Sequence, residues 1–213
     1  MEINWTYLVI ALLLLWIPAA FFYPADSKER FVSNVYGFDY NLFNYIGAWQ
    51  NWLDGLRAFA GAFCLIHLAI FPDDSVENTE QWMLGLKAAV LGIAVVLQTV
   101  HKNRIFFFLT PMFYLWGVTF VLSDWVLAVY AIVAGLCASV MSNSLDLKLW
   151  ITAGVLAVFG YLLHGINPNV FLNVVLVVIP LALVYSFNSH LVALTAYSDP
   201  EDDEDDDTEE DDE

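Results

Sequence analysis

Long apolar runs, separated by short polar segments, fill the first 198 of the 213 residues of this chain. In a bilayer only helices and closed barrels satisfy every backbone polar group, and a barrel strand alternates apolar with polar residues. Stretches such as Leu8 to Leu15 do not alternate. The pattern therefore predicts an all-α, polytopic membrane helix bundle with about seven transmembrane helices, built as one domain over residues 1–198.

A transmembrane helix needs about 20 mostly apolar residues. On this criterion, the predicted spans are residues 5–22, 55–71, 82–100, 106–123, 125–141, 149–165 and 170–187. Pro18, Pro111 and Pro180 fall inside spans, where a proline frees a backbone carbonyl and often kinks the helix. Small residues recur at helical spacing in four of the spans, which indicates close packing between helices.

The first predicted loop is long and rich in aromatic residues. Within it, Leu42, Ile46, Trp49 and Leu53 recur at helical spacing, while polar residues fall mostly on other faces of the same wheel. This pattern predicts an amphipathic helix over about 40–54 that lies in the membrane interface and can continue into the second span.

The basic residues predict the orientation. Lys87 lies inside the third span, and the other six lie in or beside the first, third and fifth loops: Lys28, Arg30, Arg57, Lys102, Arg104 and Lys148. Short loops rich in Lys and Arg stay in the cytoplasm. We therefore expect a plasma-membrane or inner-membrane protein with an outside N-terminus and a cytoplasmic C-terminus.

The C-terminal segment Asp199–Glu213 holds 13 of the 24 acidic residues, so the net charge of −17 belongs mostly to this tail. Such a segment cannot bury apolar surface and is predicted to be disordered. A cytoplasmic polyanion attracts basic proteins or divalent cations, although a purely solubilising role fits equally well. Nothing in the composition suggests nucleic acid as a partner.

Lys87 is the first candidate functional residue. A charged side chain at the centre of a span costs roughly 2.5–3.5 kcal/mol on insertion scales, so such residues often carry function. Lys87 lies near the outer end of its span, where its ammonium can also snorkel to the headgroups. It could alternatively serve as the counter-ion of an anionic ligand.

Asp54 and Arg57 form the second candidate. Three residues apart on a helix, they share one face within ion-pair reach. They lie where the predicted interfacial helix meets the second span. An anchor at the headgroup level is the simpler interpretation, and a gate or a lipid-headgroup contact is the functional one.

The histidines form the third candidate. In the predicted topology His67 and His164 end up outside, whereas His101 and His190 end up at the cytoplasmic face. Paired histidines on different helices can hold haem or a transition metal, but span ends are also ordinary positions for histidine. The sequence does not identify a cofactor or a metal.

Three functions remain open. The first is a non-enzymatic subunit or scaffold, within an oligomer or a larger membrane complex, because the span interiors carry few polar groups. The second is a small transporter or channel with Lys87, His67 and His164 near a ligand path. The third is a membrane enzyme acting on lipid, which needs a cluster of titratable groups at one interface. Convergence of these three side chains would favour the second and third functions, and dispersal would favour the first.

Overall fold

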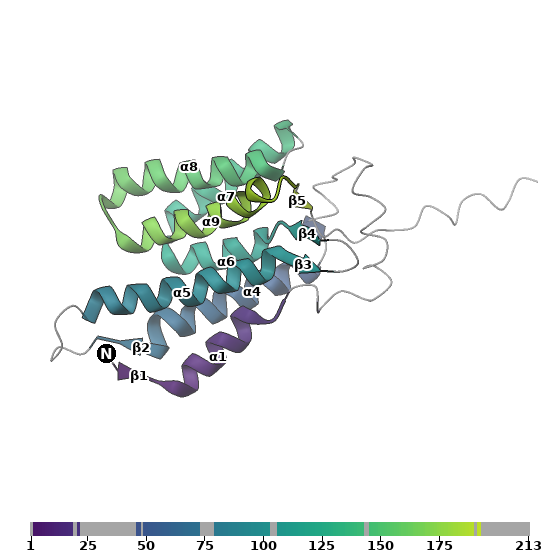
Figure 1. The fold of residues 1–213 in the computed structure, drawn as a ribbon. Helices are drawn as coiled ribbons and strands as arrows, with labels where there is room; N and C mark the ends of the chain where they lie inside the picture. The colour runs from purple at the N-terminus through teal and green to yellow at the C-terminus, as the bar shows by residue number, and fades with distance from the viewer. Residues whose placement is uncertain are drawn as a thin grey trace, which may run out of the picture.

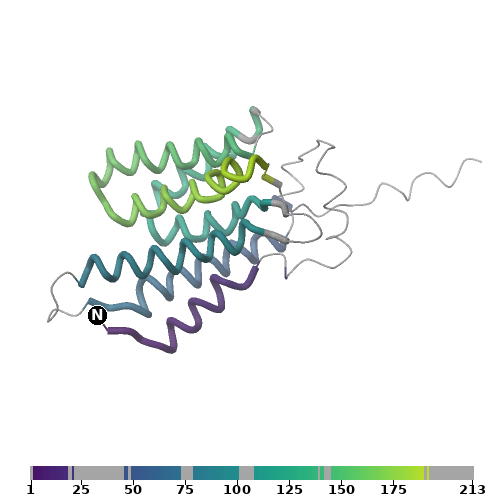
Figure 2. The backbone as a smooth tube through the Cα atoms, viewed as in Figure 1, coloured from purple at the N-terminus to yellow at the C-terminus, as the bar shows by residue number. Residues whose placement is uncertain are grey.

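The computed structural model describes residues 2–18, 21, 46–47, 49–72, 79–102, 106–142, 145–189 and 191–192. Within these ranges, seven helical segments run back and forth along one bundle (Figures 1 and 2). The predicted all-α fold is confirmed. The segments are α1 (Trp5–Trp16), α4 (Trp49–Phe63) with its π-helical continuation η3 (Cys64–Ala69), α5 (Thr79–Thr99), α6 (Met112–Leu122), α7 (Trp125–Ser142), α8 (Leu145–His164) and α9 (Pro168–Ser186).

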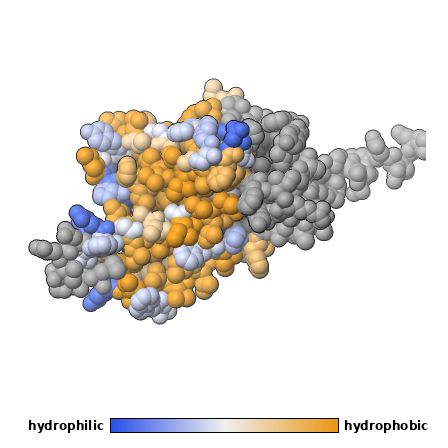
Figure 3. Space-filling view, viewed as in Figure 1, coloured by the Kyte–Doolittle hydropathy of each residue, from blue (hydrophilic) through white to orange (hydrophobic). Residues whose placement is uncertain are grey.

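Four of these segments are long and apolar enough to cross a membrane: Trp49–Ala69, Thr79–Thr99, Leu145–His164 and Pro168–Ser186. Apolar side chains cover the middle of the face seen in Figure 3, and most hydrophilic ones lie toward the ends. Exposed tryptophans mark both ends of the bundle. Trp5 and Trp125 begin α1 and α7, and Trp82 lies in the first turn of α5, while Trp49, Trp52 and Trp150 lie near the starts of α4 and α8. Two aromatic belts around an apolar middle are typical of membrane proteins.

Short strands lie directly before or after several of the helices. At one end of the bundle, β1 (Glu2–Ile3) pairs with β2 (Ile70–Phe71). At the other end, β4 (Phe106–Leu109) pairs with β3 (Val100–Lys102) and with β5 (Leu191–Val192). We refer to these as the β1–β2 end and the β3–β5 end. The strands were not expected from the sequence, and they pair backbone groups at places where no helix does so.

Prolines set two helix boundaries inside the bounds expected from the sequence. The first span was predicted over 5–22, but α1 ends at Trp16, because Ile17 precedes Pro18 and is extended (φ −66°, ψ 121°). The fourth span was predicted over 106–123, but its helix begins at Met112, directly after Pro111. Residues 106–109 form β4 instead.

α6 lies at the centre of the packing, between α4 and α9 (Figure 1). α1 packs against α4, η3 and α5, whereas α7 and α8 form the far side together with α9. α6 and α4 approach each other closely at Gly117 of α6, where an added Cβ would lie 2.2 Å from the carbonyl oxygen of Gly55 in α4. On the third predicted span, by contrast, a Cβ at Gly85 would meet nothing within 4 Å. Small residues thus mark close packing on some helices only.

Two predicted segments fall mainly outside the described residues. The predicted interfacial helix, 40–54, is described at residues 46–47 and from Trp49, which already begins α4. The acidic tail, 199–213, lies outside the described residues altogether.

Candidate functional site

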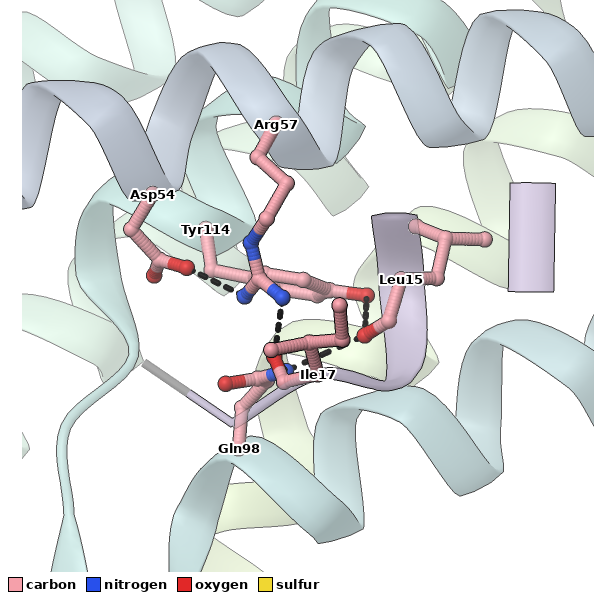
Figure 4. Close-up of polar contacts among 6 residues, drawn as sticks. All are labelled: Leu15, Ile17, Asp54, Arg57, Gln98 and Tyr114. Carbon is pink, nitrogen blue, oxygen red and sulfur yellow. Dashed lines mark hydrogen bonds and ion pairs between the residues drawn. The ribbon is translucent and has the colours of Figure 1, made fainter. Parts of the chain in front are cut away.

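The strongest concentration of polar contacts lies where α1 ends (Figure 4). The last carbonyls of any helix lack partners within it, and Pro18 prevents the chain from supplying further helical amides. The Gln98 amide of α5 donates to the carbonyl oxygens of Leu15 at 3.0 Å and Ile17 at 2.7 Å. The Tyr114 hydroxyl of α6 donates to the same Leu15 oxygen at 3.2 Å. Two helices therefore cap the end of a third.

Arg57 of α4 is the third donor. Its guanidinium donates to the Ile17 carbonyl and is ion-paired with Asp54, one turn earlier on the same helix. It also lies 5.7 Å from the centre of the Tyr114 ring. A cation beside carbonyls at a helix C-terminus interacts favourably with the helix dipole. The predicted Asp54–Arg57 pair thus exists, and its Arg57 caps a carbonyl at the end of α1.

The whole cluster is inside the protein. Asp54, Arg57, Gln98 and Tyr114 are all buried. Charge removed from water is costly unless it is paired and hydrogen-bonded, and the Asp54–Arg57 pair meets this requirement. Asp54 is therefore covered by other helices and is not exposed as a simple surface anchor would be.

The chemistry open to this cluster follows from its ligands. A carboxylate and the free carbonyls of a broken helix are groups that hold cations in membrane proteins. Here the cation beside them is the guanidinium of Arg57. The positive charge of Arg57 thus compensates the Asp54 carboxylate and the carbonyl dipoles at the end of α1. A carboxylate and backbone carbonyls are also the groups from which a cation or proton site is built.

At the β1–β2 end, Lys87 also donates to a backbone carbonyl of a neighbouring helical segment. It lies on the inward-facing side of α5, in helical register with buried Leu91 and Gln98. Its ammonium donates to the carbonyl oxygen of Ile66, the third of the six residues of η3, at 3.3 Å. Lys87 and Gln98 of α5 thus both donate to backbone carbonyls of a neighbouring helical segment.

The three residues proposed for a shared path make separate contacts. His67 is exposed, and its ring lies 4.9 Å from that of Phe63 on the same helix. His164 of α8 contacts the carboxylate of Asp124. Since α8 packs mainly on α7 and α9, His164 belongs to a different part of the bundle from Lys87. The described contacts bring none of the three side chains together.

Asp124 has its own local role in the turn between α6 and α7. Its carboxylate accepts a hydrogen bond of 2.8 Å from the Leu127 amide, as an N-cap of α7 does. This bond lowers the pKa of Asp124 below its usual value, and the contact with His164 adds to the effect. The predicted spans 106–123 and 125–141 leave only residue 124 between them, and the sequence did not indicate this pair.

Lys148 lies in a different environment from the one expected. It was counted with the basic residues beside the fifth loop, but it belongs to α8 and is 0% exposed. Its ammonium lies 5.7 Å from the ring centre of Trp116 in α6, within range of a cation–π interaction. Arg57 was counted beside the first loop and is also buried. Two of the six basic residues that were assigned to loops, Arg57 and Lys148, therefore lie within the bundle.

Metal or haem ligation gains no support from the described residues. Among them, no group of three His, Cys, Asp or Glu side chains is placed to hold a metal ion. The histidine pair predicted at the other face falls outside what is described, because His190 and the side chain of His101 are not placed.

Sequence reasoning identified part of this cluster. The three-residue spacing marked Asp54 and Arg57, whereas Tyr114 lies in an apolar run and Gln98 near the inner end of its span, where neither is distinctive. The available signal was Pro18, since a helix that stops inside a membrane protein needs donors from elsewhere.

Comparison with known proteins adds no family to these observations. No family model matches the sequence. Neither a curated protein nor a solved structure matches it.

Proposed function

We propose that this protein is a non-enzymatic subunit or scaffold of a membrane complex, with seven spans, an outside N-terminus and a cytoplasmic acidic tail. The observation that carries the proposal is the use of the buried donors. Arg57, Gln98 and Tyr114 all donate to carbonyls at the end of α1. Polar groups that hold the bundle together are what a structural subunit needs in its spans.

Seven membrane crossings agree with the positions at which the first helix starts and the last helix finishes. α1 starts at the β1–β2 end and α9 finishes toward the β3–β5 end, as an odd number of crossings requires (Figure 1). α1 has 12 residues and so measures only about 18 Å, short of the roughly 30 Å hydrocarbon core. The strand before it and the extended Ile17 after it lengthen this segment.

The orientation rests on basic residues outside the helices. With Arg57 and Lys148 inside the bundle, four remain in the first and third loops: Lys28, Arg30, Lys102 and Arg104. All four fall on one side in the seven-span topology, and that side is cytoplasmic by the positive-inside rule. Reporter fusions at Asn4 and Lys102 test this, with outside and cytoplasmic signals expected respectively.

The tail gives the scaffold its proposed partners, which are basic cytoplasmic proteins or divalent cations. Thirteen acids in fifteen residues repel one another and the negative cytoplasmic leaflet, so the segment should project from the membrane. Attraction between exposed charges is screened beyond about 8–10 Å at physiological ionic strength. Partner binding through the tail should therefore weaken with salt.

Purification from native membranes tests this function. We would compare the full chain, a chain ending at Tyr197, and a matched control whose tail acids are replaced by Asn and Gln. A cytoplasmic partner should co-purify with the full chain at low salt and be lost from both variants. The same co-purifying proteins and the same Ca²⁺ binding in all three would reject the recruiting role.

A transporter is the second candidate, and one observation favours it. α1 stops at Pro18 beside the buried charges of Asp54 and Arg57, and broken helices with buried charges occur in transport paths. Ion or proton flux in proteoliposomes of the wild type, abolished in a folded Asp54→Asn variant, would establish this function. The lipid-enzyme alternative gains no comparable support, since His67, Lys87 and His164 make separate contacts.

A further inference from the structure

We propose that Lys87 is a latch that decides whether the second helical segment stops at Ala69, and thereby whether the N-terminal strand is paired. This conformational device stands apart from the function proposed above. It rests on the end of η3, on the Lys87 hydrogen bond, and on the pairing of β1 with β2.

The first step concerns the carbonyl of Ile66. In a helix that continued, this oxygen would accept from the amide of Ile70 in α-helical register or of Phe71 in π-helical register. Both of these residues belong to β2 and pair with Ile3 and Glu2 of β1. The Lys87 ammonium takes the place of those amides at 3.3 Å. Lys87 and the amides of β2 therefore compete for one acceptor.

The second step is the cost of leaving that acceptor empty. A partly buried backbone carbonyl that loses its hydrogen-bond partner costs about 1–3 kcal/mol, so loss of Lys87 should bring in the nearest amide. That amide belongs to Ile70, because Pro72 disfavours helical backbone at Phe71. The helix would then extend through Ile70, and the Ile3–Ile70 pair would be lost.

The third step connects this change to the N-terminus. Besides the strand pair, the Asn4 amide donates to the Ala69 carbonyl at 2.8 Å. Changing from π-helical to α-helical register turns the residues that follow by about 100° around the axis. The Ala69 carbonyl would move with them, and the Asn4 bond would break. The donor on α5 thus controls the strand that precedes α1.

The geometry of α5 suits this role. Side chains on a helix lean toward its N-terminus, and α5 begins at the β1–β2 end (Figure 1). Lys87 therefore reaches toward the end of η3. In η3 itself, the residues Cys64–Ala69 include neither proline nor glycine, so the change to π-helical register has no local cause. Pro72 limits how far the helix can extend, but it does not decide between an end at Ala69 and an end at Ile70.

Hydrogen–deuterium exchange in lipid nanodiscs tests the latch, read at the N-terminal peptide that contains Glu2, Ile3 and Asn4. Lys87→Met removes the donor and should raise exchange in this peptide by at least about tenfold, as expected for loss of local pairing. Lys87→Arg retains a donor and should behave as the wild type. Gly85→Ala, on the same helix in open space, is the matched control and should also leave exchange unchanged.

Two outcomes overturn the proposal. The first is wild-type exchange of the N-terminal peptide in folded Lys87→Met. The second is an equal rise at the start of α9, which would mean general loosening of the bundle. If Lys87→Met does not fold, Lys87→Gln replaces it. Its amide is one atom shorter than the lysine chain and cannot span the present 3.3 Å contact, so the same local rise is expected.

Discussion

Two acid–base pairs in this protein share similar chemistry but differ in their surroundings. Arg57 and Asp54 are 6% and 8% exposed between packed helices, whereas His164 and Asp124 are 30% and 36% exposed at the β1–β2 end. The first pair lies in a medium that cannot solvate a lone charge, and the second lies where water can. Burial rather than charge type should therefore decide what each pair contributes.

The largest effect is expected from Arg57→Met. It leaves the Asp54 carboxylate buried without its ion pair and removes a donor from Ile17. Breaking a buried pair from one side typically costs about 3–5 kcal/mol. Thermal unfolding in detergent measures the loss. The double variant Asp54→Leu/Arg57→Met should lose less than Arg57→Met alone, and an equal or greater loss would contradict the role of the unpaired charge.

Gly117→Ala tests whether the close approach of α4 and α6 contributes to the burial of the Asp54–Arg57 pair. Its Cβ would lie 2.2 Å from the Gly55 carbonyl oxygen, and backbone cannot yield as a side chain can. α4 and α6 must then separate, at a cost of about 1–3 kcal/mol. The matched variant Gly154→Ala, which meets nothing within 4 Å, should have no such effect. Equal unfolding temperatures for the two variants would show that this approach is unimportant.

Tyr114→Phe removes one neutral donor from the buried cluster. The Leu15 carbonyl keeps the amide of Gln98 as a partner, so the loss should be about 1 kcal/mol, the usual net value of one hydrogen bond. A loss as large as that of Arg57→Met would show that the neutral bond matters as much as the ion pair. The same unfolding assay compares the two variants directly.

The exposed pair should show its contribution through pH. The pKa of Asp124 is lowered in the folded protein, chiefly by the Leu127 amide. A group of this kind stabilises the fold fully above its unfolded pKa of about 3.9, and this contribution is lost as pH falls through the lowered folded value. Unfolding temperatures below about pH 4 should therefore fall more in the wild type than in Asp124→Asn. Parallel pH profiles would disprove this assignment.

The smallest effect is expected from His164→Gln. Even a fully charged exposed pair contributes only about 0.2–1 kcal/mol, and Asp124 keeps its bond to the Leu127 amide in this variant. The unfolding temperature at neutral pH should change little, and added salt should reduce the difference further. A loss comparable to that of Arg57→Met would mean that the two pairs are not as different as their exposure indicates.

Much of the architecture follows from the sequence because lipid restricts the choices. Apolar runs without alternation require helices, and this alone predicts the all-helical bundle seen over the described residues. The three-residue spacing of Asp54 and Arg57 likewise suffices to place both on one face of a helix. Both inferences depend on local periodicity, which a sequence shows directly.

Other features depend on contacts between distant parts of the chain. Nothing near Gln98 or Tyr114 in sequence indicates that both cap the end of α1, more than 80 residues earlier. Nor does the pattern around Lys148 distinguish a loop lysine from one buried beside Trp116. The sequence by itself determined that this chain forms apolar helices, because that requirement comes from the solvent. Only the tertiary structure decided which polar side chains meet the carbonyls that prolines and helix ends leave open, because those partners come from other helices.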